Sequence, residues 1–377
     1  MALRLIHTAD WQIGKPFGNF PPDLAGELAA ARLDAIDTIV RVAGDAGAGH
    51  VLVAGDVFDS EALPALTLRR ALERMAAAPH IRWLLLPGNH DPARAGGVWD
   101  RVQRYGLPAN VTALLDAAPV LIGGEAAVLP APLRNEAPGS DPTAWMTSAV
   151  TAPGVARIGL AHGSIQGFGS EGDSSVQIAR DRAAASGLAY LALGDWHGMR
   201  EISRTTWYAG TPEPDRFPDN NPGNVLSIVI EGEGAVSVTP VRTARYHWTK
   251  IDAAVRSFAD VESLDGMLKT GDAALPRTLV RLALSGSLSL SDHARLNGWC
   301  EAAAARLRHL EVHSSSVAMT AEAADFETLG GEGPLAEAAA QLARRAADAS
   351  DPLNATAKLA LVRLFGFAAE AEREALS

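Results

Sequence analysis

Cysteine is nearly absent from this chain of 377 residues, where Cys300 is the single example. One cysteine excludes a disulfide framework and a cysteine-based zinc site, and it fits a reducing compartment. The N-terminal residues lack the basic flank, the long apolar stretch and the cleavage site of a signal peptide. No apolar run approaches the length of a membrane span. We therefore expect a cytoplasmic protein with no membrane association.

Positive charge is scarce as well. The 33 Lys and Arg residues are outnumbered by 44 Asp and Glu residues, which gives a formal net charge of −11. A protein that binds nucleic acid by itself usually has a basic surface. The substrate is therefore small, or any DNA contact is local, or a partner supplies the basic surface. Bound divalent cations would neutralise part of the negative charge.

Short apolar runs alternate with helical patterns in the first half of the chain. Runs of this kind are typical of strands that are buried on both faces, and they are Leu3–Ile6, Val51–Ala54, Trp83–Leu86, Ile158–Ala161 and Leu191–Leu193. Helical periodicity is seen over Glu27–Ala46, Pro64–Ala77 and Val176–Ala185. Alternating strands and helices predict a layered α/β domain.

The pattern changes after residue 206. Three strands are predicted in an antiparallel closing section, at Trp207–Ala209, Val225–Ile230 and Ala235–Val241. Next come a small α+β unit and an alanine-rich tail with helices at Pro334–Ala347 and Asn354–Ala375. A chain of this length exceeds one ordinary domain. We predict three parts, namely residues 1–246, 247–320 and 321–377.

Residues that suit metal binding follow each of the five apolar strands. The segments are Asp10-Trp11-Gln12, Gly55-Asp56-Val57-Phe58-Asp59, Gly88-Asn89-His90-Asp91, His162-Gly163 and Gly194-Asp195-Trp196-His197. A single Gly-Asp pair after a strand is usually only a turn, but turns alone hardly explain five such segments in order. Ligands of open α/β sheets bind at the carboxyl ends of the strands, so all five segments should converge there.

The residue types indicate the chemistry. Carboxylate, imidazole and amide oxygen are ligands for manganese, iron or zinc. Two cations roughly 3.5–4 Å apart can clamp a phosphate and activate water. Asp56, at the sharp turn after Gly55, is the best candidate for a bridging carboxylate. His90 could act as an acid at the leaving oxygen, and Asp59 could orient it. The sequence therefore predicts a metal-dependent phosphoesterase.

The order of these motifs resembles that of the calcineurin-like metallophosphoesterases. The stretches IHTADWQIGKPF, VLVAGDVFDS and WYAGTPEPDRF are more specifically similar to the SbcD family, the nuclease subunits of a bacterial double-strand-break repair complex. The similarity covers residues 1–240, is loose over the next unit and is only positional in the tail. It implies a four-layer α/β/β/α domain, a small α+β capping domain and a helical tail. It also implies that the chain can form a homodimer.

The resemblance assigns the site residues by position. One metal would be held by Asp10, Asp56, His197 and Gln12, and the other by Asp56, Asn89, His162 and Asp195, with His90 as the catalytic histidine. Gln12 and Asp195 depart from the family pattern, which has histidine at both positions. Asp195 keeps an anionic ligand and favours a harder metal such as manganese or magnesium. Gln12 offers only a neutral amide oxygen, a weak ligand, and puts the first metal position in doubt.

Three functions remain open at this point. The first is an SbcD-like DNA nuclease, exonuclease or endonuclease, that acts in DNA repair with an SMC-like coiled-coil ATPase and two divalent cations. Manganese is the expected metal, with Mg²⁺, Fe²⁺ and Zn²⁺ as alternatives. The second is a phosphodiesterase or phosphatase for a small nucleotide. The third is a catalytically weakened, metal-binding scaffold. The apolar helix around Leu361 could bind the ATPase or dock on its own domain.

Overall fold

The first sheet carries side by side three of the five apolar strands predicted in the first half of the chain. The computed structural model describes residues 2–124, 126–167, 176–217, 220–231, 235–268, 274–320 and 333–375. Its first sheet has the order β14-β13-β1-β2-β3-β4. These strands are β1 (Leu3–Thr8), β2 (His50–Val53), β3 (Arg82–Leu85), β4 (Val111–Ala113), β13 (Asn224–Ile230) and β14 (Val236–Arg242). Strands β1 to β4 run parallel, and β13 pairs antiparallel with β1 and β14, as predicted for the closing section.

The second sheet carries the other two predicted strands. Its order is β11-β12-β10-β7-β6-β5. The strands are β5 (Val120–Ile122), β6 (Ala126–Ala131), β7 (Ala156–His162), β10 (Tyr190–Gly194), β11 (Arg200–Ser203) and β12 (Thr206–Tyr208). Strands β6, β7, β10 and β12 are parallel neighbours. His162 and Gly194 are paired at the ends of β7 and β10, so the segments that follow these strands begin side by side.

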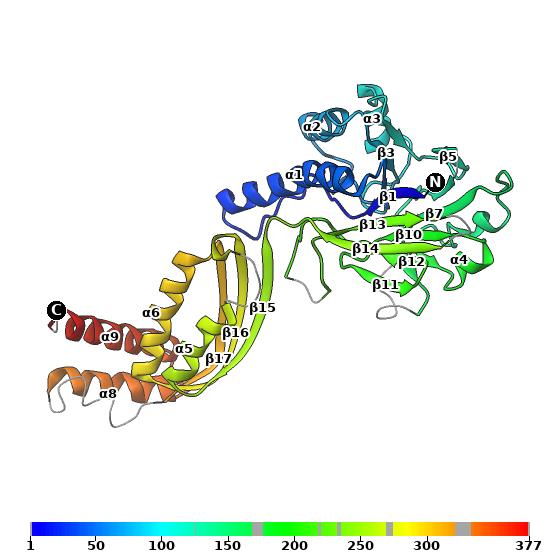
Figure 1. Cartoon of the computed structure of the whole chain (residues 1–377). Coiled ribbons are helices and arrows are strands. Elements are labelled where there is room, and N and C mark those ends of the chain that lie inside the picture. Colours follow the sequence, from blue (N-terminus) through cyan, green and yellow to red (C-terminus); the bar gives the residue numbers. More distant parts are fainter. Residues whose placement is uncertain are drawn as a thin grey trace. The chain divides into compact units, whose positions relative to one another are not determined.

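The two sheets stack face to face, with helices on their outer faces. Ile6 and Val51 pack against α1 (Pro22–Ala46), α2 (Ala65–Ala76) and α3 (Val98–Tyr105) in one core. Their neighbours Leu5 and Leu52 point the other way and pack against the second sheet. The outer face of that sheet packs against the 3₁₀ helix η1 (Ala144–Thr147) and α4 (Arg182–Ala185). Both faces of each sheet are buried, which explains the continuous apolar runs and confirms the predicted four-layer α/β/β/α fold (Figure 1).

One predicted helix is wrong over half its length. Residues 176–185 begin as strand β9 (Gln177–Ile178), which pairs in parallel with β8 (Ser164–Ile165), and only Arg182–Ala185 is helical. Val176 and Ile178 are buried while Gln177 between them is exposed. That alternation has the period of a strand, and the apolar residues at 183–185 extended it into an apparent helix.

The chain divides by its contacts into two units, Met1–Arg245 and Tyr246–Ser377. The second unit has a sheet of order β15-β16-β17, whose strands are His247–Val255, Thr278–Ser289 and His309–Thr320. All three strands are parallel. They alternate with α5 (Phe258–Leu268) and α6 (Leu290–Arg306), and the 3₁₀ helix η3 (Leu275–Arg277) precedes β16. The small unit of helices and strands is as predicted. Its strands are parallel because a helix crosses over between each strand and the next.

The tail forms the two predicted helices, α8 (Pro334–Ala347) and α9 (Asn354–Ala375). Leu361 and Phe365 of α9 pack with Ala339 of α8 and Leu290 of α6 in a small core. One side of the tail therefore docks on its own unit, whereas Leu359 and Phe367 are exposed. Residues 321–332 and 376–377 lie outside the described residues. No helix in the described part of the chain combines the length and apolarity of a membrane span.

Candidate metal centre

The loops that follow β1 and β2 run alongside each other and bring two carboxylates together. The backbone N–H of Asp10 donates to the Gly55 carbonyl at 3.1 Å, and that of Gln12 donates to the Asp56 carbonyl at 2.8 Å. Asp10, Gln12, Asp56 and Asp195 all have positive φ, and the described residues include only two other non-glycine examples. Such backbone costs about 1–3 kcal/mol per residue and tends to collect at functional sites. The strain here is concentrated at the predicted site.

Two glycines of the motifs are required by close approach. A Cβ atom on Gly55 would lie 2.1 Å from Nδ1 of His162, and a Cβ on Gly88 would lie 2.1 Å from Oδ1 of Asp56. Neither contact is sterically allowed, so a larger residue at position 55 or 88 would push a site residue away. The Gly-Asp and Gly-Asn pairs in the sequence therefore reflect the packing of the site, beyond the needs of a turn.

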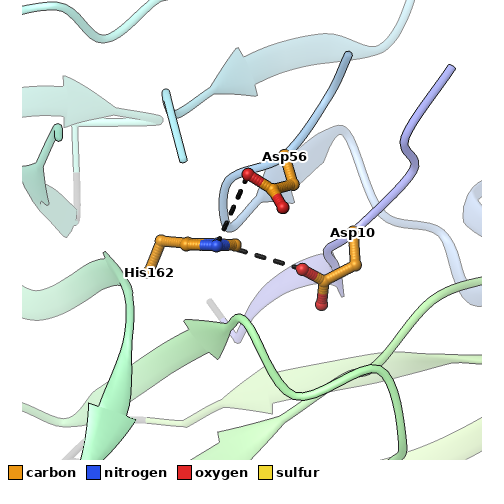
Figure 2. Close-up of side chains that lie close together, drawn as sticks. All are labelled: Asp10, Asp56 and His162. Atoms are coloured by element: carbon orange, nitrogen blue, oxygen red, sulfur yellow. Dashed lines mark ion pairs between the residues drawn. The ribbon is translucent and has the colours of Figure 1, made fainter. Parts of the chain in front are cut away.

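Asp10, Asp56 and His162 form a buried cluster whose ligand atoms all lie within 4.8 Å of one another. Figure 2 shows the His162 ring facing both carboxylates. Nε2 of His162 is 3.5 Å from Oδ1 of Asp56, and Nδ1 is 3.9 Å from Oδ1 of Asp10. The three side chains come from strand ends of both sheets, as the sequence predicted.

The two remaining residues of the same expected position adjoin His162. Oδ1 of Asn89 lies 2.7 Å from its Nε2, and Oδ1 of Asp195 lies 3.8 Å from the same atom. Nδ1 of His162 is 2.9 Å from the Ala54 carbonyl, to which it donates. A histidine anchored through Nδ1 presents Nε2 as its ligand atom. Oxygen atoms of Asp56, Asn89 and Asp195 therefore all lie within 3.8 Å of Nε2 of His162.

Gln12 meets the second carboxylate oxygen of Asp56, and His197 adjoins Gln12. Nε2 of Gln12 is 3.5 Å from Oδ2 of Asp56 and 3.3 Å from Nε2 of His197. His90 is at the rim, where its Nε2 is 3.9 Å from Oδ2 of Asp56 and its side chain is 44% exposed. Its Nδ1 lies 3.0 Å from the backbone carbonyl oxygen of Asp59. The contact that orients His90 is thus made by the main chain of residue 59, where the sequence pointed to the carboxylate.

The electrostatics of the cluster are those of crowded, buried anions. Burial raises the pKa of Asp10 to about 6, although the charges of His197 and His162 oppose the shift. Burial lowers the pKa of His162, but the carboxylates of Asp56, Asp10 and Asp195 outweigh it and raise this pKa to about 9. The site therefore holds a proton on His162 at neutral pH when no metal cation is present to balance the carboxylates.

A divalent cation fits these residues. Oδ2 of Asp10 is fully buried and has no hydrogen-bond partner among the described residues. A buried carboxylate oxygen with no donor costs free energy that a cation would recover. The carboxylates, the imidazole and the amide oxygen in and beside this cluster form the donor set of manganese and related metals. Asp10, Asp56 and His162, with Asn89 and Asp195 beside them, would hold the cation.

Two residues that support the site were given no role from the sequence. Arg32 of α1 is buried and donates to the carbonyls of Asp10, Trp11 and Glu213 and to Oγ1 of Thr211. Asp91 is also buried and accepts from the backbone N–H groups of Gly88 and Phe58 at 2.6 and 3.1 Å. Arg32 does give a signal in the sequence, because it lies four residues from both Leu28 and Ile36 on the apolar stripe of the helix.

The affinity for a divalent cation should increase with pH. The cation needs neutral His162, so the proton held with a pKa of about 9 must leave on binding. Between pH 7 and 8.5 the dissociation constant for Mn²⁺ should fall about tenfold per pH unit, with about one proton released per cation. Titration calorimetry in buffers of different ionisation enthalpy measures both quantities. An affinity independent of pH in this range would show that the cation does not displace a proton from His162.

Comparison with known proteins is consistent with this geometry. The sequence profile described as calcineurin-like phosphoesterase matches residues 3–232. No curated protein matches significantly. The chain is similar to the solved TT1561 of Thermus thermophilus and to purple acid phosphatase PPD1 from yellow lupin (Lupinus luteus) seeds, both at 13% identity and a TM-score of 0.38. Each alignment covers 64% of this chain, with 100% and 52% of the respective relative. Because the profile spans well over half of the sequence, the chain belongs to the calcineurin-like phosphoesterase family.

Proposed function

We propose that this protein is a metal-dependent DNA nuclease that hydrolyses phosphodiester bonds, acting in the cytoplasm in DNA repair. The observation that supports hydrolase activity is the buried cluster of Asp10, Asp56 and His162, which lies beside the exposed His90. The step from phosphoesterase to nuclease rests on the resemblance of residues 1–240 to the SbcD family. The exposure of His90 favours a polymeric substrate such as DNA. A polymer cannot enter a closed pocket, but it can reach a residue at the rim of the site.

The protein residues have separable roles in the proposed reaction. Divalent cations, with manganese as the first choice, would act as Lewis acids on the phosphate and on the attacking water. Asp56 accepts the backbone N–H of His90 at 3.0 Å, so the metal-binding carboxylate also fixes the loop that carries the candidate acid. His90 then stands where a leaving oxygen could take up a proton. Asn89 and Ala54 hold the His162 ring from its two nitrogen atoms.

The test is cleavage by the purified chain. Linear DNA, plasmid DNA and a chromogenic phosphodiester are each incubated with Mn²⁺, Mg²⁺ or a chelator. We expect manganese-dependent cleavage of DNA that the chelator abolishes. His90→Asn should lower the rate by roughly 10²–10⁴-fold, the usual contribution of a positioned acid. Hydrolysis of the small ester alone would favour a nucleotide phosphodiesterase, and no hydrolysis with any divalent cation would contradict the proposed activity.

One observation favours a second candidate function, a metal-binding scaffold of low catalytic power. Gln12 meets both Asp56 and His197 with its amide nitrogen, which cannot ligate a cation. Half of the expected two-metal site is thereby altered. A scaffold would still bind manganese and gain thermal stability from it, but would leave every phosphodiester substrate intact in the cleavage assay.

We also propose that the tail binds an SMC-like coiled-coil ATPase. Leu359 and Phe367 of α9 lie eight residues apart and are 54% and 68% exposed. Residues that are eight positions apart lie on the same face of a helix. Leu359 and Phe367 therefore form one apolar ridge to which a partner helix could bind. A net charge of −11 agrees with a partner that carries much of the DNA binding.

Substitutions in this ridge should weaken binding of the ATPase without changing the cleavage activity. Leu359→Asp and Phe367→Asp should each weaken the complex with the ATPase by roughly thirtyfold, the effect of losing about 2 kcal/mol at an apolar anchor. Cleavage by the isolated chain should not change. Leu66→Asp, at another exposed leucine (59%) in the first unit, is the matched control and should bind normally. Unaltered binding by both tail variants in a co-purification assay would exclude this surface.

A further inference from the structure

Four side chains next to the metal cluster close a ring of hydrogen bonds. Nζ of Lys15 lies 3.0 Å from Oε1 of Gln12 and 2.7 Å from Oδ2 of Asp215. Nε2 of Gln12 lies 3.3 Å from Nε2 of His197, and Nδ1 of His197 lies 3.0 Å from Oδ1 of Asp215. Gln12 and Asp215 are buried, so the ring is largely shielded from solvent.

The donors and acceptors of the ring allow one arrangement. The Lys15 ammonium can only donate, so the Gln12 atom that faces it must be the carbonyl oxygen. The NH₂ group of Gln12 is thereby turned toward Oδ2 of Asp56 and Nε2 of His197. The Gln12 NH₂ group can only donate and the Asp215 carboxylate can only accept, so His197 accepts through Nε2 and carries its proton on Nδ1. Arg216, whose Nη2 lies 3.0 Å from the same Nδ1, donates instead to the two carboxylate oxygens of Asp215, each at 3.2 Å. Every group in the ring is then satisfied within the protein.

This arrangement uses the atoms that a second cation would need. A cation shared by Asp56 and His197 would bind the carboxylate oxygen and the Nε2 lone pair that the Gln12 NH₂ group now meets. The Lys15 ammonium, one hydrogen bond further away and paired with Asp215, holds the Gln12 amide in this orientation. By contrast, the buried Oδ2 of Asp10 has no partner among the described residues and stays available to a cation.

We propose that this chain binds one divalent cation, at the Asp10, Asp56 and His162 cluster, and that the Gln12–Lys15 pair takes the place of the second. Gln12 is then a polar neighbour of the metal centre and not a ligand. His197 has a structural role, tying the loop after β10 to Asp215. The inference rests on the proposed metal site, and it deepens the proposed function by giving the enzyme one metal and a lysine in place of two metals.

The number of bound cations tests the inference directly and does not depend on any activity of the protein. Titration of the wild-type chain with Mn²⁺ should give one site, and the electron paramagnetic resonance spectrum should be that of an isolated ion. Gln12→Glu keeps the length of the side chain, replaces the NH₂ group by oxygen and adds a negative charge. This variant should bind a second Mn²⁺ and show the spectrum of a spin-coupled pair. Gln103→Glu adds the same charge at an exposed position of α3 and should still bind one.

Each outcome is decisive. Two Mn²⁺ ions per wild-type chain with a coupled spectrum would overturn the inference and leave the proposed phosphoesterase activity standing. No bound Mn²⁺ would overturn both. If Gln12→Glu unfolds, which its melting temperature reveals, the wild-type stoichiometry and spectrum alone decide between one cation and two. Cleavage of DNA by a chain with one ion supports both the inference and the function, while one ion without cleavage supports the inference alone.

Discussion

Replacement of Asp56 by asparagine is expected to reduce manganese-dependent hydrolysis by roughly 10³-fold or more. Asp56 is buried, lies 3.5 Å from Nε2 of His162 and accepts the backbone N–H of His90. Asparagine preserves the shape and one acceptor oxygen but removes the charge that draws a cation into the cluster. A cation contributes several kcal/mol to the stabilisation of a phosphoryl transition state, and about 1.4 kcal/mol corresponds to a tenfold change in rate.

The same variant should bind Mn²⁺ much more weakly, which is measured by titration calorimetry beside the rate of DNA cleavage. Asp116→Asn makes the identical chemical change at an exposed carboxylate of the first unit and should alter neither quantity. Asp56→Asn should melt normally or at a higher temperature, because it removes one of several crowded anions. A variant that keeps its rate and its affinity for Mn²⁺ would remove Asp56 from the metal centre.

The largest loss of stability is expected from Arg32→Leu. The Arg32 guanidinium is buried and donates four hydrogen bonds, of 2.7 to 3.1 Å, to the loop after β1 and to the segment around Glu213. Leucine leaves three of those buried oxygen atoms without the Arg32 donor and without a replacement for it among the described residues, while the Glu213 carbonyl keeps the Thr211 hydroxyl as a donor at 2.8 Å. The cost should be roughly 4 kcal/mol, which lowers the melting temperature of the first unit by about 10 °C.

Differential scanning calorimetry of the full chain measures this loss. Arg32→Lys keeps the charge but not the planar fork of donors, so it should lose an intermediate amount. Arg41→Leu removes an exposed arginine of the same helix, whose ion pair with Asp45 is at the surface, and should shift the melting temperature little. Equal melting temperatures for Arg32→Leu and Arg41→Leu would show that Arg32 does not hold the two loops together.

The strands and the approximate positions of the site residues could be predicted because both depend on short stretches of sequence. An apolar run buried on two faces identifies a strand such as β2, and Gly55-Asp56 after it identifies the turn at its end. The prediction of a helix over Val176–Ala185 was wrong because its apolar residues fit both the helical and the strand period. The pairing of Ile178 with Ile165 decided in favour of a strand at its start. Local sequence does not contain that pairing.

The orientation of Gln12 could not be predicted for a related reason. Position 12 was expected to offer an oxygen to a metal, but Lys15 takes that oxygen in the structure. Lys15 is itself held by Asp215, which is 200 residues away in the sequence. The choice between the two ends of one amide thus depends on contacts made only after both sheets have assembled.

Anomalous diffraction from crystals soaked in Mn²⁺ tests the metal centre most directly. The peak should lie within bonding distance, about 2.2 Å, of Asp56 and of Nε2 of His162. One peak per chain is predicted, with Gln12 still bonded to Lys15 and outside the coordination sphere. The absence of a peak at the Asp10, Asp56 and His162 cluster, or a peak bound elsewhere on the chain, would contradict the proposed metal centre.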